Sequence, residues 1–226
     1  MSGFEAYIQI LKAEFQKAAN PKISKEMAAY MRNQFAFLGI KTPERRNIQK
    51  PFLHKDALPD KSQLHKTVRH FWNKAEREYQ YFAQELAMKY SKNIEPDDIE
   101  LYEYMITNKS WWDTVDMIAT KLVGAYLKKY PNRINEYVNK WIASGNIWLQ
   151  RTAILFQLKY KNDLDTELLQ EIILQLKDTD EFFINKAIGW ILREYAKINP
   201  QWVIDFTNKT KLNNLSMREA LKNIKH

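Results

Sequence analysis

The sequence predicts an all-α protein, folded as a curved array of antiparallel helical repeats with a concave face. Three observations support this fold class. Glycine is scarce, with five residues in 226, and apolar residues recur at helical spacing along almost the whole chain. No convincing strand pair or two-residue hairpin turn interrupts that pattern. At ordinary helix length, the chain has room for roughly ten or more helices.

Apolar stripes and prolines predict where the helices begin and end. The first stripe consists of Phe4, Tyr7, Ile8, Leu11 and Phe15. Asn20-Pro21 should end that helix. Thr42-Pro43-Glu44 is a helix-start signal, with a capping hydroxyl, a proline at the first helical position and an acid in the first turn. Further junctions between helices are expected at Pro96, Pro131 and Pro200.

A repeat is visible in four apolar segments that each run into a basic, tyrosine-containing ending. These segments are AQELAMKY (83–90), VGAYLKKY (123–130), AILFQLKY (153–160) and IGWILREYAK (188–197). Their tyrosines, at positions 90, 130, 160 and 195, are 40, 30 and 35 residues apart. This is the period of the helix pair in HEAT-like or armadillo-like arrays, so we expect a stack of helical pairs.

Composition narrows the possible functions. The chain has no cysteine, and its four histidines lack the spacing of a metal-binding helix motif, so we expect neither a metal nor another cofactor. The N-terminus does not resemble a signal peptide, and no apolar stretch approaches membrane-spanning length. We therefore expect a soluble, cytoplasmic monomer that does not bind membranes. Its length and 45% hydrophobic content favour one domain over residues 1–226.

The charge is positive and uneven. The formal net charge is +8, and the excess lies in residues 1–50 and 114–226, whereas the segment between them is slightly acidic. Such a distribution is typical of a protein with one basic face and a polyanionic partner. From charge alone, a solvated lysine-rich surface is an equally good interpretation.

Tryptophan occurs beside charged residues in three predicted helices. Within KSWWDTVD (109–116), Trp112 and Asp116 are four residues apart and share a helix face. WLQR (148–151) and WILR (190–193) each place a tryptophan three residues before an arginine. A single tryptophan on a helix is usually a core residue. Gathered on one concave wall, this set would suit a cationic group attached to a phosphate backbone.

Four motifs closely resemble the AlkD family of DNA alkylation repair enzymes. They are FLGIKTPERR (37–46), KSWWDTVD, WIASGNIWLQRTAILFQLKYK (141–161) and EFFINKAIGWILREYAK (181–197). The resemblance runs in order along nearly the whole chain and is weakest near residues 50–65 and after about residue 205. It implies HEAT-like repeats with a concave DNA-binding face. It also implies removal of positively charged N3- or N7-alkylated purines from double-stranded DNA.

The resemblance also implies roles for individual residues. Asp116 looks like the catalytic aspartate, and Trp112 and Trp190 look like the two aromatic site residues. Arg151 looks like the arginine that binds the DNA backbone, and Tyr30 is similar to another DNA-facing residue. We further assign DNA binding to Arg193 and Trp148, which lie beside members of this set in WILR and WLQR.

The predicted chemistry needs few groups. An alkylated purine already carries a positive charge, so it leaves as a neutral base without a general acid. Asp116 would then stabilise the oxocarbenium-like sugar and position the attacking water. Two questions stay open: whether the base is extruded or excised while stacked, and whether Asp116 instead caps a helix or pairs internally with a lysine or arginine. In the latter case, the chain could be a non-catalytic helical scaffold for nucleic acid or protein.

Overall fold

The computed structural model describes residues 3–224, with side chains from Glu5 onward. Within this range the regular structure is helical, apart from an isolated bridge between Ala36 and Glu76. The all-α prediction is therefore confirmed. The side chain of Phe4, part of the first predicted stripe, lies outside the described residues. No helix between residues 3 and 224 is long and apolar enough to cross a membrane.

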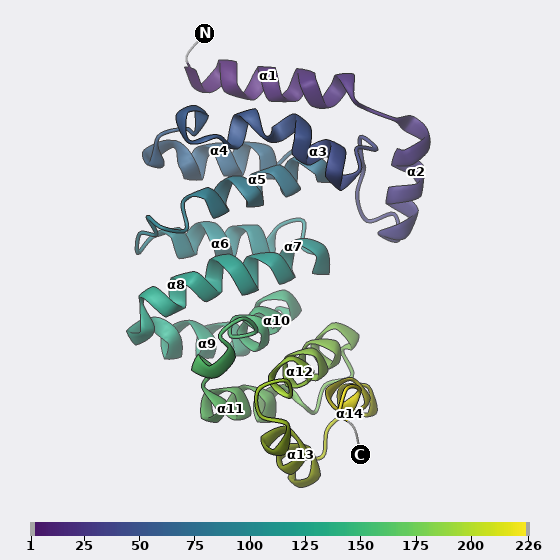
Figure 1. Ribbon diagram of the computed structural model, residues 1–226, viewed down its shortest axis with the longest axis vertical. Helices are drawn as coiled ribbons and strands as arrows, with labels where there is room; N and C mark the ends of the chain where they lie inside the picture. The colour runs from purple at the N-terminus through teal and green to yellow at the C-terminus, as the bar shows by residue number, and fades with distance from the viewer. Residues whose placement is uncertain (1–2, 225–226) are drawn as a thin grey trace. The chain divides into compact units, whose positions relative to one another are not determined.

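The chain divides into two units, residues 1–93 and 94–226 (Figure 1). The first holds α1 (Gly3–Lys17), α2 (Pro21–Tyr30), α3 (Thr42–Gln49), η1 (Pro51–Leu53), η2 (Lys55–Ala57), η3 (Lys61–Gln63), α4 (Leu64–Trp72) and α5 (Arg77–Lys89). The second holds α6 (Asp98–Thr107), α7 (Trp112–Met117), η4 (Ile118–Val123), α8 (Gly124–Lys129), η5 (Pro131–Arg133), α9 (Ile134–Ala143), α10 (Ile147–Leu155), η6 (Lys161–Asp163), α11 (Thr166–Leu176), α12 (Phe182–Tyr195), α13 (Pro200–Lys209) and α14 (Asn214–Leu221). The expectation of one domain over residues 1–226 stays a prediction.

Helix boundaries follow the prolines, with one local correction. Pro21 and Pro200 each occupy the first turn of a helix, α2 and α13, and the side chain of the preceding asparagine caps both helices. Thr42-Pro43-Glu44 does begin α3, but the prediction of a capping hydroxyl is wrong. Thr42 is already the first residue of that helix, and Lys41 takes the cap position without a side-chain hydrogen bond. The fixed φ of proline predicted the start, but not which residue caps it.

In the first unit, the FLGIK motif is a buried turn built around Glu78. The Glu78 carboxylate is fully buried and accepts backbone N–H bonds from Leu38, Gly39 and Ile40 at 2.9–3.1 Å. Gly39 has a φ of +90°, and a Cβ there would lie 2.1 Å from the carbonyl oxygen of Asn20. Only glycine fits this position. The residues of this motif therefore have a structural role in forming the turn.

The repeated tyrosines lie at or after helix ends: Tyr90 and Tyr130 directly follow α5 and α8, Tyr195 is the last residue of α12, and Tyr160 lies five residues after the end of α10. Three of them join successive repeats. Tyr90 follows the last residue of α5 and donates its hydroxyl to the carbonyl of Pro59. In the second unit, Tyr130 donates to Ile94 at 3.1 Å, and Tyr160 donates to Gly124 at 2.7 Å. Each of these three hydroxyls thus satisfies a backbone carbonyl of the preceding repeat. This contact accounts for the recurrence of tyrosine at about one repeat length in the sequence.

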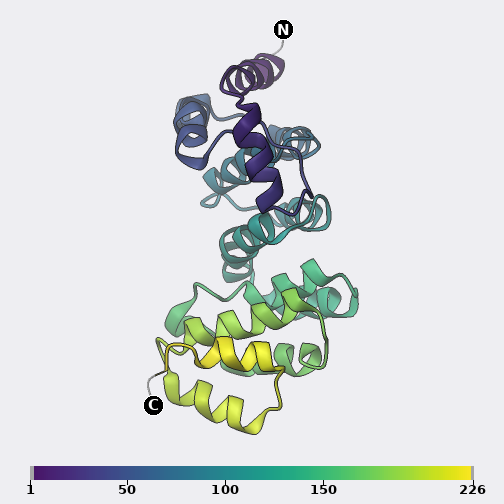
Figure 2. The same cartoon turned by 90° about the vertical axis from the view of Figure 1, so that its right-hand side faces the viewer.

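The second unit is organised around α10. This helix packs against α6, α7, α9, α11 and α12. The segment α7–η4–α8 is one continuous helix whose middle, Ile118–Val123, has π-type geometry. The C-terminal helices α12, α13 and α14 pack against one another, and Figure 2 shows them in green to yellow. Because α10 touches both α7 and α12, the three predicted Trp-bearing helices meet within this unit.

Candidate active site

The KSWWDTVD motif forms the start of α7. Trp111 is extended, with φ −161° and ψ 159°, and precedes the first helical residue, Trp112. Asp113 lies in the first turn, where the partial positive charge of a helix N-terminus favours a carboxylate. Trp112 and Asp116 are then one helical turn apart on the same face, as the spacing predicts.

The structure pairs Asp116 with Arg151 of α10. The Arg151 Nε lies 2.6 Å from Asp116 Oδ1, and its Nη2 lies 2.8 Å from Oδ2. The guanidinium therefore donates a bidentate pair of hydrogen bonds to the two carboxylate oxygens. The remaining nitrogen, Nη1, donates to the carbonyl of Phe183. Arg151 is only 5% exposed, whereas 16% of the Asp116 side chain remains accessible. The pair is therefore held by several hydrogen bonds, buried on its arginine side and partly open on its aspartate side.

Two opposing effects act on the Asp116 carboxyl. Burial raises the pKa of Asp116 above its ordinary value, because a charge is poorly solvated there. The hydrogen bonds and positive charge of Arg151 lower this pKa again, and the nearby Asp113 carboxylate raises it. The net direction is upward. Arg151 therefore partly offsets the effect of burial on the Asp116 carboxyl.

Trp148 belongs to an aromatic cluster next to this pair. Its ring centroid lies 5.8 Å from that of Trp111 and 4.9 Å from that of Phe183, and the Trp111 and Phe183 rings are 5.2 Å apart. Trp148 is buried. The cluster supports the N-terminal end of α7 and the backbone of Phe183, which in turn accepts from Arg151. The predicted DNA contact of Trp148 stays a prediction.

A small cavity opens beside the ion pair. This Trp112 cavity encloses about 200 Å³ and is lined by Trp112, Arg151, Phe182, Phe183 and Lys186. Phe182 is exposed, and Trp112 is partly exposed. Trp190 is also partly exposed and lies four residues after Lys186 on α12, so the two share a helix face. Aromatic walls, a cation and a fixed carboxylate thus occur within one unit.

Arg193, the other predicted DNA-binding arginine, has a partner on α14. Its Nη1 donates to Glu219 Oε2, and Glu219 Oε1 lies 3.0 Å from Lys186 Nζ. One carboxylate therefore binds two cations of α12. The sequence interpretation missed Lys186, Phe182 and Glu219. Spacing from Trp190 could have indicated Lys186, but nothing in the sequence connects Glu219 to the site.

Tyr30 lies in the first unit, at the end of α2. Its side chain is 73% exposed. It borders a separate cavity of about 200 Å³ whose lining includes Met27, Phe37, Lys41 and Tyr81. This exposure is compatible with a DNA contact, and that role stays a prediction.

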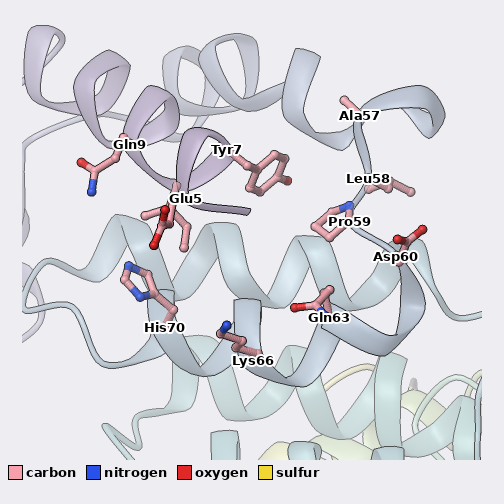
Figure 3. Close-up of a pocket in the computed structure, with 11 residues that line it drawn as sticks. Glu5, Tyr7, Gln9, Ala57, Leu58, Pro59, Asp60, Gln63, Lys66 and His70 are labelled. Carbon is pink, nitrogen blue, oxygen red and sulfur yellow. The ribbon is translucent and has the colours of Figure 1, made fainter. Parts of the chain in front are cut away.

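A larger cavity in the first unit contains none of the predicted site residues. It encloses about 860 Å³ and is shown in Figure 3. Side chains from α1, among them Glu5 and Tyr7, face Gln63, Lys66 and His70 of the segment that leads into and forms α4. Its lining includes both acidic and basic side chains. Volume therefore does not identify the candidate site, and the cavity beside the Asp116–Arg151 pair carries the more specific chemistry.

Comparison with known proteins supports the resemblance noted in the motifs. Residues 11–224 match the family model described as DNA alkylation repair enzyme. A solved structure described as a predicted DNA alkylation repair enzyme from Enterococcus faecalis is 34% identical, with a TM-score of 0.85. The match covers 91% of this chain and 96% of that one. No curated protein matches significantly. The chain belongs to the family of DNA alkylation repair enzymes.

Proposed function

We propose that this protein is a monofunctional DNA glycosylase that hydrolyses the N-glycosidic bond of cationic N3- and N7-alkylated purines in double-stranded DNA. Family membership places it in DNA alkylation repair. The observation that supports the specific chemistry is the Asp116 carboxylate, gripped at both oxygens by Arg151 and still partly accessible. A buried carboxylate held in one orientation suits electrostatic stabilisation of a developing cation.

The reaction needs no acid at the base. The glycosidic bond breaks with its electron pair moving onto the alkylated purine, which neutralises the purine's positive charge. The positive charge then develops on the sugar, between C1′ and the ring oxygen, where the Asp116 carboxylate stabilises it. Water adds to C1′ and loses a proton, first to Asp116 and then to solvent. The products are the free neutral base and a sugar hydroxyl, and no metal or cofactor takes part.

Arg151 orients Asp116 in this scheme. The arginine holds the carboxylate in position before the substrate arrives, so little reorganisation is needed as charge develops. Its three nitrogens each have a protein acceptor. The contact between Arg151 and a DNA phosphate that the resemblance implies would use the guanidinium's remaining N–H groups. The rings of Trp112 and Trp190 would attract the electron-poor nucleotide.

The test is release of the base from duplex DNA containing N7-methylguanine, measured under single-turnover conditions. Asp116→Asn should slow release by about a hundredfold or more. Asp163→Asn is the matched control, because it removes the same charge from an exposed pair with Lys128. It should release base at the wild-type rate. Near-wild-type release by Asp116→Asn would refute the role of Asp116.

The pairing with Arg151 makes a folding control necessary. Asp116→Asn leaves the guanidinium of Arg151 without its carboxylate, so this variant can also lose activity through a change in folding. Circular dichroism at the assay temperature separates the two effects. Asp116→Glu, which keeps the negative charge and moves it by one methylene, should retain more activity than Asp116→Asn. Equal rates for the two variants would contradict an electrostatic role.

The internal pair also supports a second candidate, a non-catalytic DNA-binding scaffold. Under that interpretation Asp116 serves only to neutralise Arg151. Wild-type protein that binds alkylated duplex but releases no base would establish the scaffold and reject the glycosylase.

A further inference from the structure

The C-terminal helix α14 lies against α12 at a glycine. A Cβ on Gly189 would lie 2.5 Å from the Cβ of Glu219 and 2.9 Å from the carbonyl oxygen of Ser216. The absence of a side chain at Gly189 therefore permits the close approach of the two helices. This approach places Glu219 beside the face of α12 that carries Lys186 and Arg193.

Glu219 binds both cations from a largely buried position. Its side chain is 13% exposed, its Oε1 lies 3.0 Å from Lys186 Nζ, and its Oε2 accepts from Arg193. The hydrogen bond from Lys186 lowers the pKa of Glu219 below its usual range, so the carboxylate is charged at neutral pH. Lys186 and Arg193 are seven residues apart, two turns of one helix face. Glu219 thus sets where the Lys186 ammonium sits along that face.

Lys186 is better placed than Arg151 to meet a phosphate. The positive charge of Arg151 is matched by Asp116, and its side chain is 5% exposed. Lys186 lines the same cavity but is 36% exposed. An ammonium has three N–H donors, and Glu219 Oε1 takes one of them. A phosphodiester oxygen at the mouth of the cavity can accept another.

We infer that Lys186 binds a DNA phosphate beside the lesion and that Glu219 of α14 is the positioning residue that holds Lys186 at the rim of the Trp112 cavity. The inference rests on the proposed function, since it names a backbone contact of the same site. Glu219 has two separable effects. It reduces the net positive charge of the surface, which weakens general attraction to DNA, and it fixes the ammonium of a lysine that lines the cavity, which aids reaction at the lesion.

These two effects predict a distinctive phenotype for Glu219→Gln, which keeps the side-chain shape. The variant should bind undamaged duplex several-fold more tightly, because one negative charge is lost. At saturating enzyme it should nevertheless release N7-methylguanine about tenfold more slowly, the scale of one charge-assisted hydrogen bond. A purely structural defect would instead weaken binding and lower the melting temperature together.

Glu194→Gln, on α12, is the matched control. Glu194 also binds two lysines, with 2.7 Å to Lys197 and 3.9 Å to Lys159, and it does not line the Trp112 cavity. This substitution should raise DNA affinity by a similar factor and leave the single-turnover rate unchanged. If Glu219→Gln releases base within twofold of the Glu194→Gln rate, positioning by Glu219 is rejected.

Substitutions of Lys186 test the phosphate contact without any need for catalysis. The slope of log affinity against log salt should become shallower by about 0.9 in Lys186→Gln, and Lys186→Arg should restore it. If Glu219 acts through Lys186, adding Glu219→Gln to Lys186→Gln should slow base release no further. An unchanged salt slope, or fully additive rate losses, would overturn the inference. Failure of wild-type protein to release any base would reject the proposed function and leave the salt slope as an independent result.

Discussion

Two carboxylates, Glu78 and Asp116, differ in how they are held, and the difference separates a structural role from a chemical one. In the first unit, Glu78 is fully enclosed and accepts three backbone N–H bonds from the FLGIK turn. In the second, Asp116 is held by a side chain, Arg151, and 16% of it remains exposed. Backbone amides satisfy Glu78 where the chain must turn. Asp116 retains an open side, which makes it the carboxylate available to a ligand.

The widest expected effect concerns the charge of the substrate. If Asp116 acts on the sugar and the water but does not protonate the base, neutral lesions such as hypoxanthine or uracil lack the activation that an alkylated purine brings. Acid–base catalysis typically contributes about 10²- to 10⁴-fold, so neutral lesions should be slower than N7-methylguanine by at least that range. Single-turnover rates on matched duplexes check this. Equal rates would mean that the site also supplies an acid that protonates the base, so that a group other than Asp116 takes part in the reaction.

Substitution of Glu78 should reveal a structural role. Glu78→Gln replaces one acceptor oxygen by an N–H donor facing backbone N–H groups, and it removes a charge-assisted acceptor. The free energy of unfolding should fall by about 3 kcal/mol or more. Urea titration followed by circular dichroism measures this loss. Below the melting temperature, base release should stay near wild type, and a large loss of rate in folded protein would contradict the structural assignment.

Acid should slow the reaction through Asp116. Because burial raises the pKa of Asp116 against the opposing effect of Arg151, the acid limb of the single-turnover rate should have its midpoint above the ordinary aspartate value of about 3.9. The protonated carboxyl carries no charge to stabilise the sugar. The effect on stability has the opposite sign, since the folded state holds this proton more tightly than the unfolded chain. Ionisation of Asp116 therefore reduces stability as the pH rises from about 3.9 through the raised pKa.

A pH profile of base release, restricted to conditions where circular dichroism shows folded protein, measures this limb. Asp163→Asn should follow the wild-type profile, because Asp163 lies in an exposed pair. An acid limb below the ordinary aspartate pKa would show that the reaction does not depend on the ionisation of Asp116.

The smallest effect is expected at Tyr30. Because this side chain is 73% exposed, Tyr30→Ala should change the free energy of unfolding by no more than about 0.5 kcal/mol. If Tyr30 contacts DNA, the affinity for duplex should fall by a few-fold, about 1 kcal/mol. Fluorescence anisotropy with labelled duplex, beside a thermal melt, separates the two. Unchanged affinity would remove Tyr30 from the DNA-binding set.

Local sequence patterns predicted the features that depend on residues close together in one helix. Apolar spacing and prolines predicted the helices, and a separation of four residues placed Trp112 and Asp116 on one face. The cap of α3 was predicted one residue too late, since Thr42 lies inside the helix. Sequence propensity identifies the start of a helix more reliably than it identifies the residue that caps that start.

Contacts between helices could not be predicted in the same way. Arg151 lies 35 residues after Asp116, and their pairing depends on how α10 packs against α7. Glu219 lies in the part of the chain where the motif resemblance is weakest, and it reaches Lys186 only because Gly189 admits α14. Such pairs depend on how the helices pack against one another. Neither the charge nor the periodicity of a single segment predicts that packing.

The tyrosine bonds between repeats have a consequence for how such a chain can change length. Tyr90, Tyr130 and Tyr160 reach carbonyls 31, 36 and 36 residues earlier, so each hydroxyl measures roughly one repeat. Duplication or loss of a whole repeat-length segment would give each hydroxyl an equivalent acceptor. Insertion of a few residues within a helix would rotate the ring away from its carbonyl. The repeat, and not the single helix, is therefore the unit by which this architecture can be lengthened or shortened during evolution.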